Sequence, residues 1–545
     1  MPRRTLPETS YAPMASLPGM KPPCDDAAIR SVPADSPCRP QSGPWILAAA
    51  ILGTSMAFID STVVNVALPA LESSFKAGVI DVQWVVESYG LFLGALILVG
   101  GAAGDRFGRR KVFLTGIALF ALASTACGMA QSIHQLIAAR ALQGIGAALL
   151  TPGSLAIISA SFPEAERGRA IGTWSGFSAI TTALGPVLGG WLIQHATWRW
   201  IFFINLPLAA AVILISIVHV PESRGRVAKR LDLLGALLAI IGLGGLVFGL
   251  IESPRLGWTN LEVSGSLLIA IVSLISFPFV EARAPSPMVP LTLFRSRTFS
   301  GANLLTLFLY AALGIFFFIF PMNLIQVQGY SATAAGAAAL PLILLIFFLS
   351  RWSGGLVSRY GAKPPLIIGP LIVAAGFALF TVPGVGSSYW KSFFPAFIVL
   401  GFGMAVSVAP LTTAVMGTVD QKFAGAASGI NNAVARVAGL LAIAVFGILM
   451  VNAFATRLDR QLANLNLPSA ARQQLLSNRT RLAAIDPPSG LDPAQTANAK
   501  TAIDNSFLFA FRLVTFCCAA LSVASAVTAT LIIEGPANHQ KTFPR

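Results

Sequence analysis

Long apolar stretches separated by short polar connectors make up this chain from Pro44 onward. Each stretch holds roughly 18 to 26 residues, enough for a helix that rises about 1.5 Å per residue to cross a bilayer core of about 30 Å. The stretches are residues 44–70, 82–103, 110–130, 134–160, 168–193, 199–220, 231–251, 263–280, 299–324, 334–356, 364–383, 392–416, 425–452 and 507–533. These segments predict an all-α polytopic membrane protein with 14 transmembrane helices.

The Lys and Arg residues of the connectors indicate the orientation of the spans. With a cytoplasmic N-terminus, the internal cytoplasmic connectors hold seventeen of these cations. The short connectors on the other side hold four, which are Lys76, Arg199, Arg255 and Lys391. Because cations are enriched in cytoplasmic connectors, we expect both termini in the cytoplasm. The long polar segment 453–506 is then expected outside.

Parts of the first half of the chain recur weakly in the second half. The stretch GGAAGDRFGRRK, residues 100–111, returns as GGLVSRYGAK, residues 354–363, with Ser358 in the place of Asp105. Likewise, QGIGAALLTP is echoed by LGFGMAVSVAP. Parallel repeats of this kind are typical of transporters in which two bundles rock about a substrate site near the membrane midplane.

The repeat predicts two six-helix bundles, related by a pseudo-two-fold axis, with two further spans inserted between them. The boundaries are 1–43 for a disordered cytoplasmic tail, 44–220 for the N-terminal bundle, 221–298 for the inserted pair, 299–533 for the C-terminal bundle with its external loop 453–506, and 534–545 for a second cytoplasmic tail. The first tail is rich in Pro and Ser and lacks the apolar region of a signal peptide.

Composition agrees with a membrane protein and excludes several functions. The chain is 55% hydrophobic and 11% charged, with a mean hydropathy of +0.74, whereas soluble domains are about 25% charged. The net charge of +15 does not indicate a nucleic-acid partner, because no polar basic segment carries interleaved aromatic residues. The Cys and His residues show no metal-ligand spacing, and no G-x-x-x-x-G-K-[ST] loop is present. We therefore expect no cofactor, no metal site and no enzymatic activity.

Ionisable residues inside the predicted spans are the strongest functional candidates. Placing a charge at mid-bilayer costs at least about 2.5–3.5 kcal/mol, so such a residue normally faces a cavity or a partner. Asp60 and Arg140 lie in the first and fourth spans. A buried carboxylate can bind a proton and release it when the field of a nearby cation changes, so Asp60 is the leading candidate for proton coupling. Helix packing for Asp60, and a structural ion pair with Asp60 or a backbone carbonyl for Arg140, remain the alternatives.

Two further charges and one aromatic run belong to the same set of candidates. Glu87 begins the second span, where either proton coupling or a solvated position fits. Arg436 is an intramembrane cation of the thirteenth span, for which we favour a structural role over substrate binding. The run GIFFFIFP, Gly314 to Pro321, is predicted to face lipid rather than to line a substrate cavity.

Six motifs follow one another along the chain: IDSTVVNVALPAL at 59–71, GDRFGRRK at 104–111, RALQGIGAALLTP at 140–152, LGPVLGGWL at 184–192, WRWIFFINLP at 198–207 and IESPRLGW at 251–258. Together they resemble the major facilitator superfamily, specifically its fourteen-span drug:proton antiporter branch. One departure is Thr181, where the fifth-span motif of that branch tends to carry a glycine.

The resemblance implies a proton-coupled secondary exporter of amphipathic drugs or other small organic compounds, which works by alternating access in the bacterial inner membrane. It implies that a cytoplasmic gate latches the two bundles in the outward-facing state, with the residues Gly101, Asp105, Arg106, Gly108 and Arg109. It implies a fifth-span contact that limits proton leak, with the residues Gly185, Pro186, Gly189 and Gly190. Arg140 matches an arginine that tunes proton binding. Simple positive-inside anchors and an ordinary packing groove are the alternatives for the two motifs.

Other transport functions remain to be weighed against export. A facilitator, or a proton-coupled uptake transporter of a small organic nutrient, fits the same fold and is the second hypothesis. A channel is disfavoured, because the sequence shows no re-entrant filter segment and no ring-forming motif. The expected partners are a small-molecule substrate, protons and the lipid bilayer, with no nucleic acid, and a periplasmic adaptor protein is left open.

Overall fold

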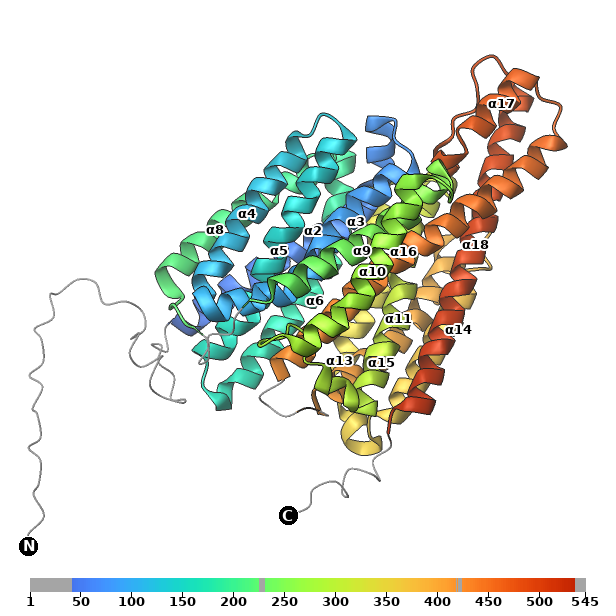
Figure 1. The fold of residues 1–545 in the computed structure, drawn as a ribbon. Helices are drawn as coiled ribbons and strands as arrows, with labels where there is room; N and C mark the ends of the chain where they lie inside the picture. Colours follow the sequence, from blue (N-terminus) through green and yellow to red (C-terminus); the bar gives the residue numbers. More distant parts are fainter. Residues whose placement is uncertain (1–41, 225–230, 418, 420–423, 535–545) are drawn as a thin grey trace, which may run out of the picture.

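The computed structural model describes residues 42–534 of the chain, apart from 225–230, 418 and 420–423. Its elements are helices that run side by side (Figure 1). The predicted cytoplasmic tails, 1–43 and 534–545, lie almost wholly outside the described residues. The sequence boundaries of the bundles therefore stay a prediction, while the helices themselves can be compared with the predicted spans.

The first-half helices and the inserted pair are α2 (Gly43–Phe75), α3 (Val79–Phe107), α4 (Arg109–Met129), α5 (Ile133–Ser161), α6 (Glu164–His195), α7 (Trp200–Phe203), α8 (Asn205–His219), α9 (Leu233–Leu256) and α10 (Leu261–Arg283). The second-half helices are η2 (Leu291–Arg295), α11 (Arg297–Met322), η3 (Asn323–Val327), α12 (Ala332–Ala337), α13 (Leu340–Tyr360), α14 (Lys363–Leu379), η4 (Tyr389–Phe393), α15 (Phe394–Gly417), α16 (Ala424–Ala463), α17 (Ser469–Ser477), η6 (Arg479–Ala484) and α18 (Pro493–Ile532).

Twelve helices or consecutive helix pairs in the described residues are long and apolar enough to cross a membrane. They coincide with twelve of the predicted spans. The remaining two predicted spans are helical as well: α14 is apolar but has 17 residues, and α6 is rich in Gly, Ser and Thr. The protein is therefore an all-α polytopic membrane protein, and the total of fourteen spans stays a prediction.

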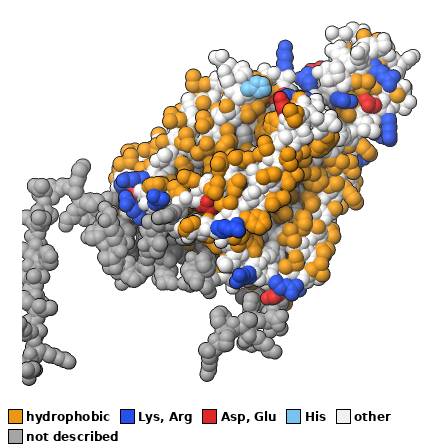
Figure 2. Space-filling model, in the orientation of Figure 1, with side chains coloured by type: hydrophobic (Ala, Val, Ile, Leu, Met, Phe, Trp, Pro, Cys, Tyr) orange, Lys and Arg blue, Asp and Glu red, His pale blue; other side chains and the backbone are white. Residues whose placement is uncertain are grey.

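The surface follows the same division. Figure 2 shows hydrophobic side chains covering the flank of the helices, with Lys and Arg gathered toward the ends. Large apolar side chains of several helices stay exposed, for example Leu122 of α4 at 71%, Ile275 of α10 at 59% and Phe348 of α13 at 71%. Exposure on this scale over a continuous band is expected where lipid tails, rather than water, cover the protein.

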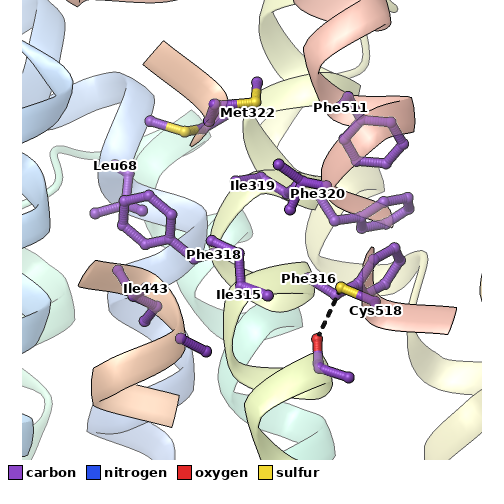
Figure 3. Close-up of a cluster of buried hydrophobic side chains, with 14 of the residues drawn as sticks. Leu68, Ile315, Phe316, Phe318, Ile319, Phe320, Met322, Ile443, Phe511 and Cys518 are labelled. Atoms are coloured by element: carbon purple, nitrogen blue, oxygen red, sulfur yellow. Dashed lines mark hydrogen bonds between the residues drawn. The ribbon is translucent and has the colours of Figure 1, made fainter. Parts of the chain in front are cut away.

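The aromatic run of α11 is a correction to the sequence analysis, because these phenylalanines do not face lipid. Phe316, Phe318 and Phe320 are each at most 2% exposed. Figure 3 shows Phe316 and Phe320 turned toward Phe511 of α18, and Phe318 turned toward α2 and α16. The run failed as a lipid signal because α11 packs against α2, α15, α16 and α18, which leaves it little lipid-facing surface.

The two halves meet along several helix pairs. First-half α6 packs against α12 and α13, α3 packs against α16, and α2 packs against α11. The inserted helix α9 packs against both α3 and α16, and α10 packs on α9. At the predicted outer end, η6 contacts α2, α3 and η3, and α17 projects beyond the other helices (Figure 1). The fold thus places the interior of the first half next to the seam between halves.

Candidate functional site

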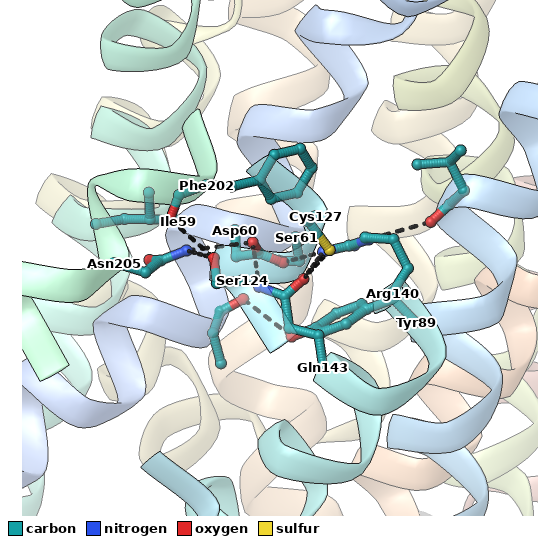
Figure 4. A network of polar contacts seen from close by, with 12 residues as sticks. Ile59, Asp60, Ser61, Tyr89, Ser124, Cys127, Arg140, Gln143, Phe202 and Asn205 are labelled. Atoms are coloured by element: carbon teal, nitrogen blue, oxygen red, sulfur yellow. Dashed lines mark hydrogen bonds and ion pairs between the residues drawn. The ribbon is translucent and has the colours of Figure 1, made fainter. Parts of the chain in front are cut away.

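A buried polar network lies inside the first half (Figure 4). Asp60 comes from α2, Arg140 and Gln143 come from α5, and Asn205 begins α8. Arg140 and Gln143 are three residues apart, so both side chains lie on one face of α5. None of the four residues is more than 1% exposed. The structure therefore joins the two sequence-predicted residues Asp60 and Arg140 and adds two amides to them.

The Asp60 carboxylate accepts hydrogen bonds on both oxygens. Arg140 Nη1 pairs with Oδ2, while Gln143 Nε2 and Asn205 Nδ2 donate to Oδ1 at 2.8 and 3.4 Å. Arg140 also donates to Gln143 Oε1 at 2.7 Å, and its Nε donates to the carbonyl oxygen of Val85 at 3.1 Å. This hydrogen bonding offsets the cost of removing both charges from water.

Neighbouring side chains connect this network to two further helices. The Arg140 guanidinium carbon lies 4.2 Å from the centre of the Tyr89 ring on α3, a cation–π contact. The Tyr89 hydroxyl donates to the carbonyl oxygen of Ala57 at 3.3 Å. Asn205 Nδ2 also donates to Ser124 Oγ of α4 at 3.0 Å. The network around Asp60 thus connects α2, α3, α4, α5 and α8, and a change of charge at Asp60 alters contacts among these helices.

Glu87 has a different environment from Asp60. It is 1% exposed, and neither carboxylate oxygen has a hydrogen-bond partner within the described part of the chain. One turn earlier, Gln83 Nε2 donates to the carbonyl oxygen of Ile443 at 3.3 Å, so this face of α3 meets α16. The solvated position considered for Glu87 is therefore wrong, since the carboxyl group is buried at the seam between halves.

The inserted helix α9 covers α3 at the level of Glu87. Trp84 Nε1 donates to Glu252 Oε1 at 2.9 Å. On the other side of Glu87, a Cβ added at Gly244 would lie 3.4 Å from Leu91. Helix α9 therefore follows α3 from one side of Glu87 to the other and separates this part of the seam from the lipid.

The glycine and charge cluster predicted as a gate lies where α3 ends and α4 begins. Asp105 Oδ1 accepts from Arg109 Nε and Nη2 at 3.0 and 2.9 Å, within the cluster itself. Gly108 has a φ of +117°, a conformation that disfavours other residues. Arg106 is exposed and lies over Phe107. Across the described residues, no hydrogen bond or ion pair joins Asp105 to the second half.

Glu222 holds this cluster, and sequence reasoning missed it. Its two carboxylate oxygens accept from the backbone N–H groups of Arg110 and Lys111 at 3.1 and 3.2 Å. These groups belong to the first turn of α4, where a negative charge is favourable. A Cβ at Gly108 would lie 2.7 Å from the Glu222 carboxylate. The signal that could have revealed Glu222 is its position directly after the sixth predicted span, on the same predicted cytoplasmic side as the cations of residues 106–111.

The fifth-span glycines pack against two different partners. A Cβ at Gly185 would lie 2.2 Å from Thr62 Oγ1, and one at Gly189 would lie 2.0 Å from Val63, both on α2. A Cβ at Gly190 would lie 2.2 Å from the carbonyl oxygen of Ala332, on second-half α12.

The α12 contact is reciprocal, since a Cβ at Gly336 would lie 2.0 Å from the carbonyl oxygen of Pro186. The motif therefore brings the backbones of α6 and α12 together across the seam.

The other residues singled out by the sequence are not part of the Asp60 network. Some of them are glycines at close contacts between helices. Gly101 borders Pro152 of α5, and the neighbouring Gly100, which sequence reasoning missed, approaches the Ala148 carbonyl oxygen more closely. Arg436 is half-buried on α16 and faces Phe58. In the described ranges, no group of three His, Cys, Asp or Glu side chains could hold a metal ion.

Comparisons with known proteins give one family and several relatives. The family model described as Major Facilitator Superfamily matches residues 50–443. The chain is 38% identical over 413 residues to Multidrug resistance protein Stp of Mycobacterium tuberculosis (strain CDC 1551 / Oshkosh), which covers 74% of each chain. It is 33% identical over 497 residues to the Tetracenomycin C resistance and export protein of Streptomyces glaucescens, covering 89% of this chain and 91% of that one.

A solved structure has the same fold. It is a bacterial homolog of the human lysosomal transporter Spinster, in an inward-facing and unoccupied conformation. The TM-score is 0.62 at 18% sequence identity, and the match covers 92% of this chain and 100% of that chain.

Proposed function

Because the chain belongs to the Major Facilitator Superfamily, we propose that this transporter exports amphipathic drugs or other small organic compounds in exchange for protons. The observation that carries the proposal is the buried ion pair between Asp60 and Arg140. A carboxylate inside the helices, with its counter-ion on another helix, is a group whose protonation changes helix packing. The names of the relatives, a multidrug resistance protein and a tetracenomycin C resistance and export protein, support export.

Proton binding at Asp60 would act through the network around it. A neutral Asp60 no longer balances the charge of Arg140, whose remaining partners are Gln143 Oε1 and the Val85 carbonyl oxygen. The guanidinium then moves with α5 relative to α2, and the Tyr89 ring beneath it moves with α3. A proton and a substrate would in this way favour opposite arrangements of the same helices, which is the requirement for exchange.

The outer and inner ends of the seam support an alternating-access cycle. At the predicted outer end, α6 and α12 are in backbone contact, and η6 packs on α2 and α3. At the predicted cytoplasmic end, Asp105 pairs within its own cluster. We assign this arrangement to the state closed to the outside, with both termini in the cytoplasm and the protein in the bacterial inner membrane. In the opposite state, Asp105 would latch onto the second half.

Replacing Asp105 with Asn is expected to reduce transport by about tenfold or more, since a charge-assisted hydrogen bond of the proposed latch is lost. Insertion and abundance should stay nearly unchanged, because the side chain lies at a helix end and is partly exposed. Transport into inverted vesicles and the amount of folded protein, measured in parallel, check this. Loss of folded protein with unchanged turnover per molecule would instead assign Asp105 a purely structural role.

Inverted membrane vesicles with an acid interior test the function as a whole. Adding tetracenomycin C, or an amphipathic dye such as ethidium, should release protons from the interior, as reported by a pH-sensitive dye. Vesicles without the protein are the control. Substrate movement that does not depend on the proton gradient would contradict antiport and favour the facilitator. Substrate and protons moving in the same direction would favour proton-coupled uptake.

A further inference from the structure

Arg436 carries a charge at the centre of the molecule. It lies 12 residues after the start of α16, about 18 Å along the helix. Its Cβ is 3.6 Å from the position of a Cβ at Gly94, in the middle of the second span. Its guanidinium carbon lies 5.7 Å from the ring centre of Phe58, in the middle of the first span. Arg436 is therefore near the midplane, on the seam between halves.

The charge of Arg436 has no protein partner within the described ranges. Its guanidinium forms no hydrogen bond or ion pair there and lies over the Phe58 ring. Arginines near helix ends extend their charge to the interface, but about half of a 30 Å core lies between Arg436 and either membrane surface. Arg140 shows how this protein neutralises a buried arginine, because its guanidinium has three hydrogen-bond acceptors, among them the Asp60 carboxylate, and lies over the Tyr89 ring. Arg436 lacks such a set.

The surroundings of Arg436 are aromatic and partly accessible. Phe58 of α2, Tyr310 of α11 and Arg436 of α16 are all half-buried, although Phe58 and Tyr310 sit at the middle of their helices and Arg436 lies more than three turns into α16. Tyr310 belongs to α11 and Tyr89 to α3, and both helices pack directly against α16. Flat apolar rings beside an unpaired guanidinium provide a surface for a ring system and a donor fork for an acidic group.

Resting on the proposed export of organic compounds, we propose that Arg436 binds an anionic oxygen group, such as a carboxylate, of an aromatic amphipathic substrate. The guanidinium donates two hydrogen bonds to the two oxygens, and Phe58 and Tyr310 contact the rings. The binding also reaches the proton site, because Phe58 lies two residues before Asp60 and next to Ala57, which accepts the Tyr89 hydroxyl. The substrate class is thus acidic aromatic amphiphiles.

A matched pair of dyes tests the inference. Tetramethylrhodamine carries a free carboxylate, whereas in its methyl ester that group is blocked. We expect the purified full-length protein to bind the acid about tenfold or more tightly than the ester, measured by fluorescence anisotropy at equilibrium. Arg436→Gln should abolish this preference and leave binding of the ester unchanged, which shows that the variant is folded. Arg436→Lys should retain part of it, because the charge remains and the fork is lost.

Arg457 provides the control variant. It lies on the same helix, is exposed, and places its guanidinium carbon 5.4 Å from the Phe509 ring. Arg457→Gln should therefore leave the preference for the acid unchanged. Equal binding of both dyes by the parent protein, or an unchanged preference in Arg436→Gln, would overturn the inference. Equilibrium binding needs no proton gradient, so a protein that preferred the acid but released no protons would refute antiport and not this site.

Discussion

Vesicles that contain the Asp60→Asn variant are expected to show no substrate-driven proton release, even where substrate binding persists. The Asn side chain keeps the size of Asp and can hydrogen-bond to Gln143, but it cannot take up a proton. Loss of the charge also leaves Arg140 buried without its counter-ion, which costs about 3–5 kcal/mol. We therefore expect lower thermal stability in addition to the loss of coupling, measured as melting temperature and as dye response per folded molecule.

Two further variants separate coupling from folding. In the double variant Asp60→Asn/Arg140→Gln, both charges are removed together, so stability should return toward that of the parent while proton release stays absent. Glu262→Gln neutralises an exposed acid in the first turn of α10 and should behave like the parent. If Asp60→Asn exchanged protons for substrate at the parental rate, Asp60 would be excluded as the coupling group. Glu87, buried at the seam and without a hydrogen-bond partner in the part of the chain that the structure describes, would then be the candidate.

The variant Gly190→Val is expected to abolish transport by preventing closure of the outer end. Any Cβ at this position would lie 2.2 Å from the Ala332 carbonyl oxygen, and the atom in its way is backbone. Overpacking costs about 1–3 kcal/mol, which shifts a two-state equilibrium about 5- to 150-fold. Because the contact joins α6 to α12, the strain falls on the state in which the two halves meet.

A buried reporter on the seam can detect this shift. Leu68 is 0% exposed and lies beside Phe318 of the second half (Figure 3). With the native cysteines replaced by alanine, Leu68→Cys should react with a membrane-impermeant maleimide in the Gly190→Val variant and resist it in the parent. The matched variant Gly265→Val, at a glycine with open space around it, should leave both transport and labelling unchanged. Protection of the introduced thiol in both proteins would contradict the assignment of this contact to outer closure.

The sequence predicted the features that depend on local pattern. The spans follow from the length of apolar stretches, and the pairing of Asp60 with Arg140 was among the alternatives because buried charges need partners. The amides Gln143 and Asn205 were missed, because neutral polar residues in a span do not stand out until neighbouring helices place them around one carboxylate. Glu222 was missed for a similar reason, since its partners are backbone groups 111 and 112 positions away.

Packing also decided the interpretations that failed. Phe316 and Phe320 have the composition of a lipid face, but helices distant in sequence surround them. Glu87 was placed close to the outer water by its position in the span, yet it is 1% exposed on a helix that packs against both α16 and α9. In both cases the sequence of one helix shows which side chains lie on a face. It does not show whether lipid, water or another helix covers that face.

The position of α9 has an implication for how this architecture can be altered. A carboxyl group on the seam would otherwise border hydrocarbon, and α9 insulates it by lying along α3 on both sides of Glu87. Removing the inserted pair to obtain a smaller transporter would therefore expose Glu87 to lipid hydrocarbon and destabilise the protein. The acid at position 87 and the inserted helices therefore depend on each other. A shortened chain would need an apolar residue at position 87, and an acid there would be tolerated only in a chain that keeps the extra helices.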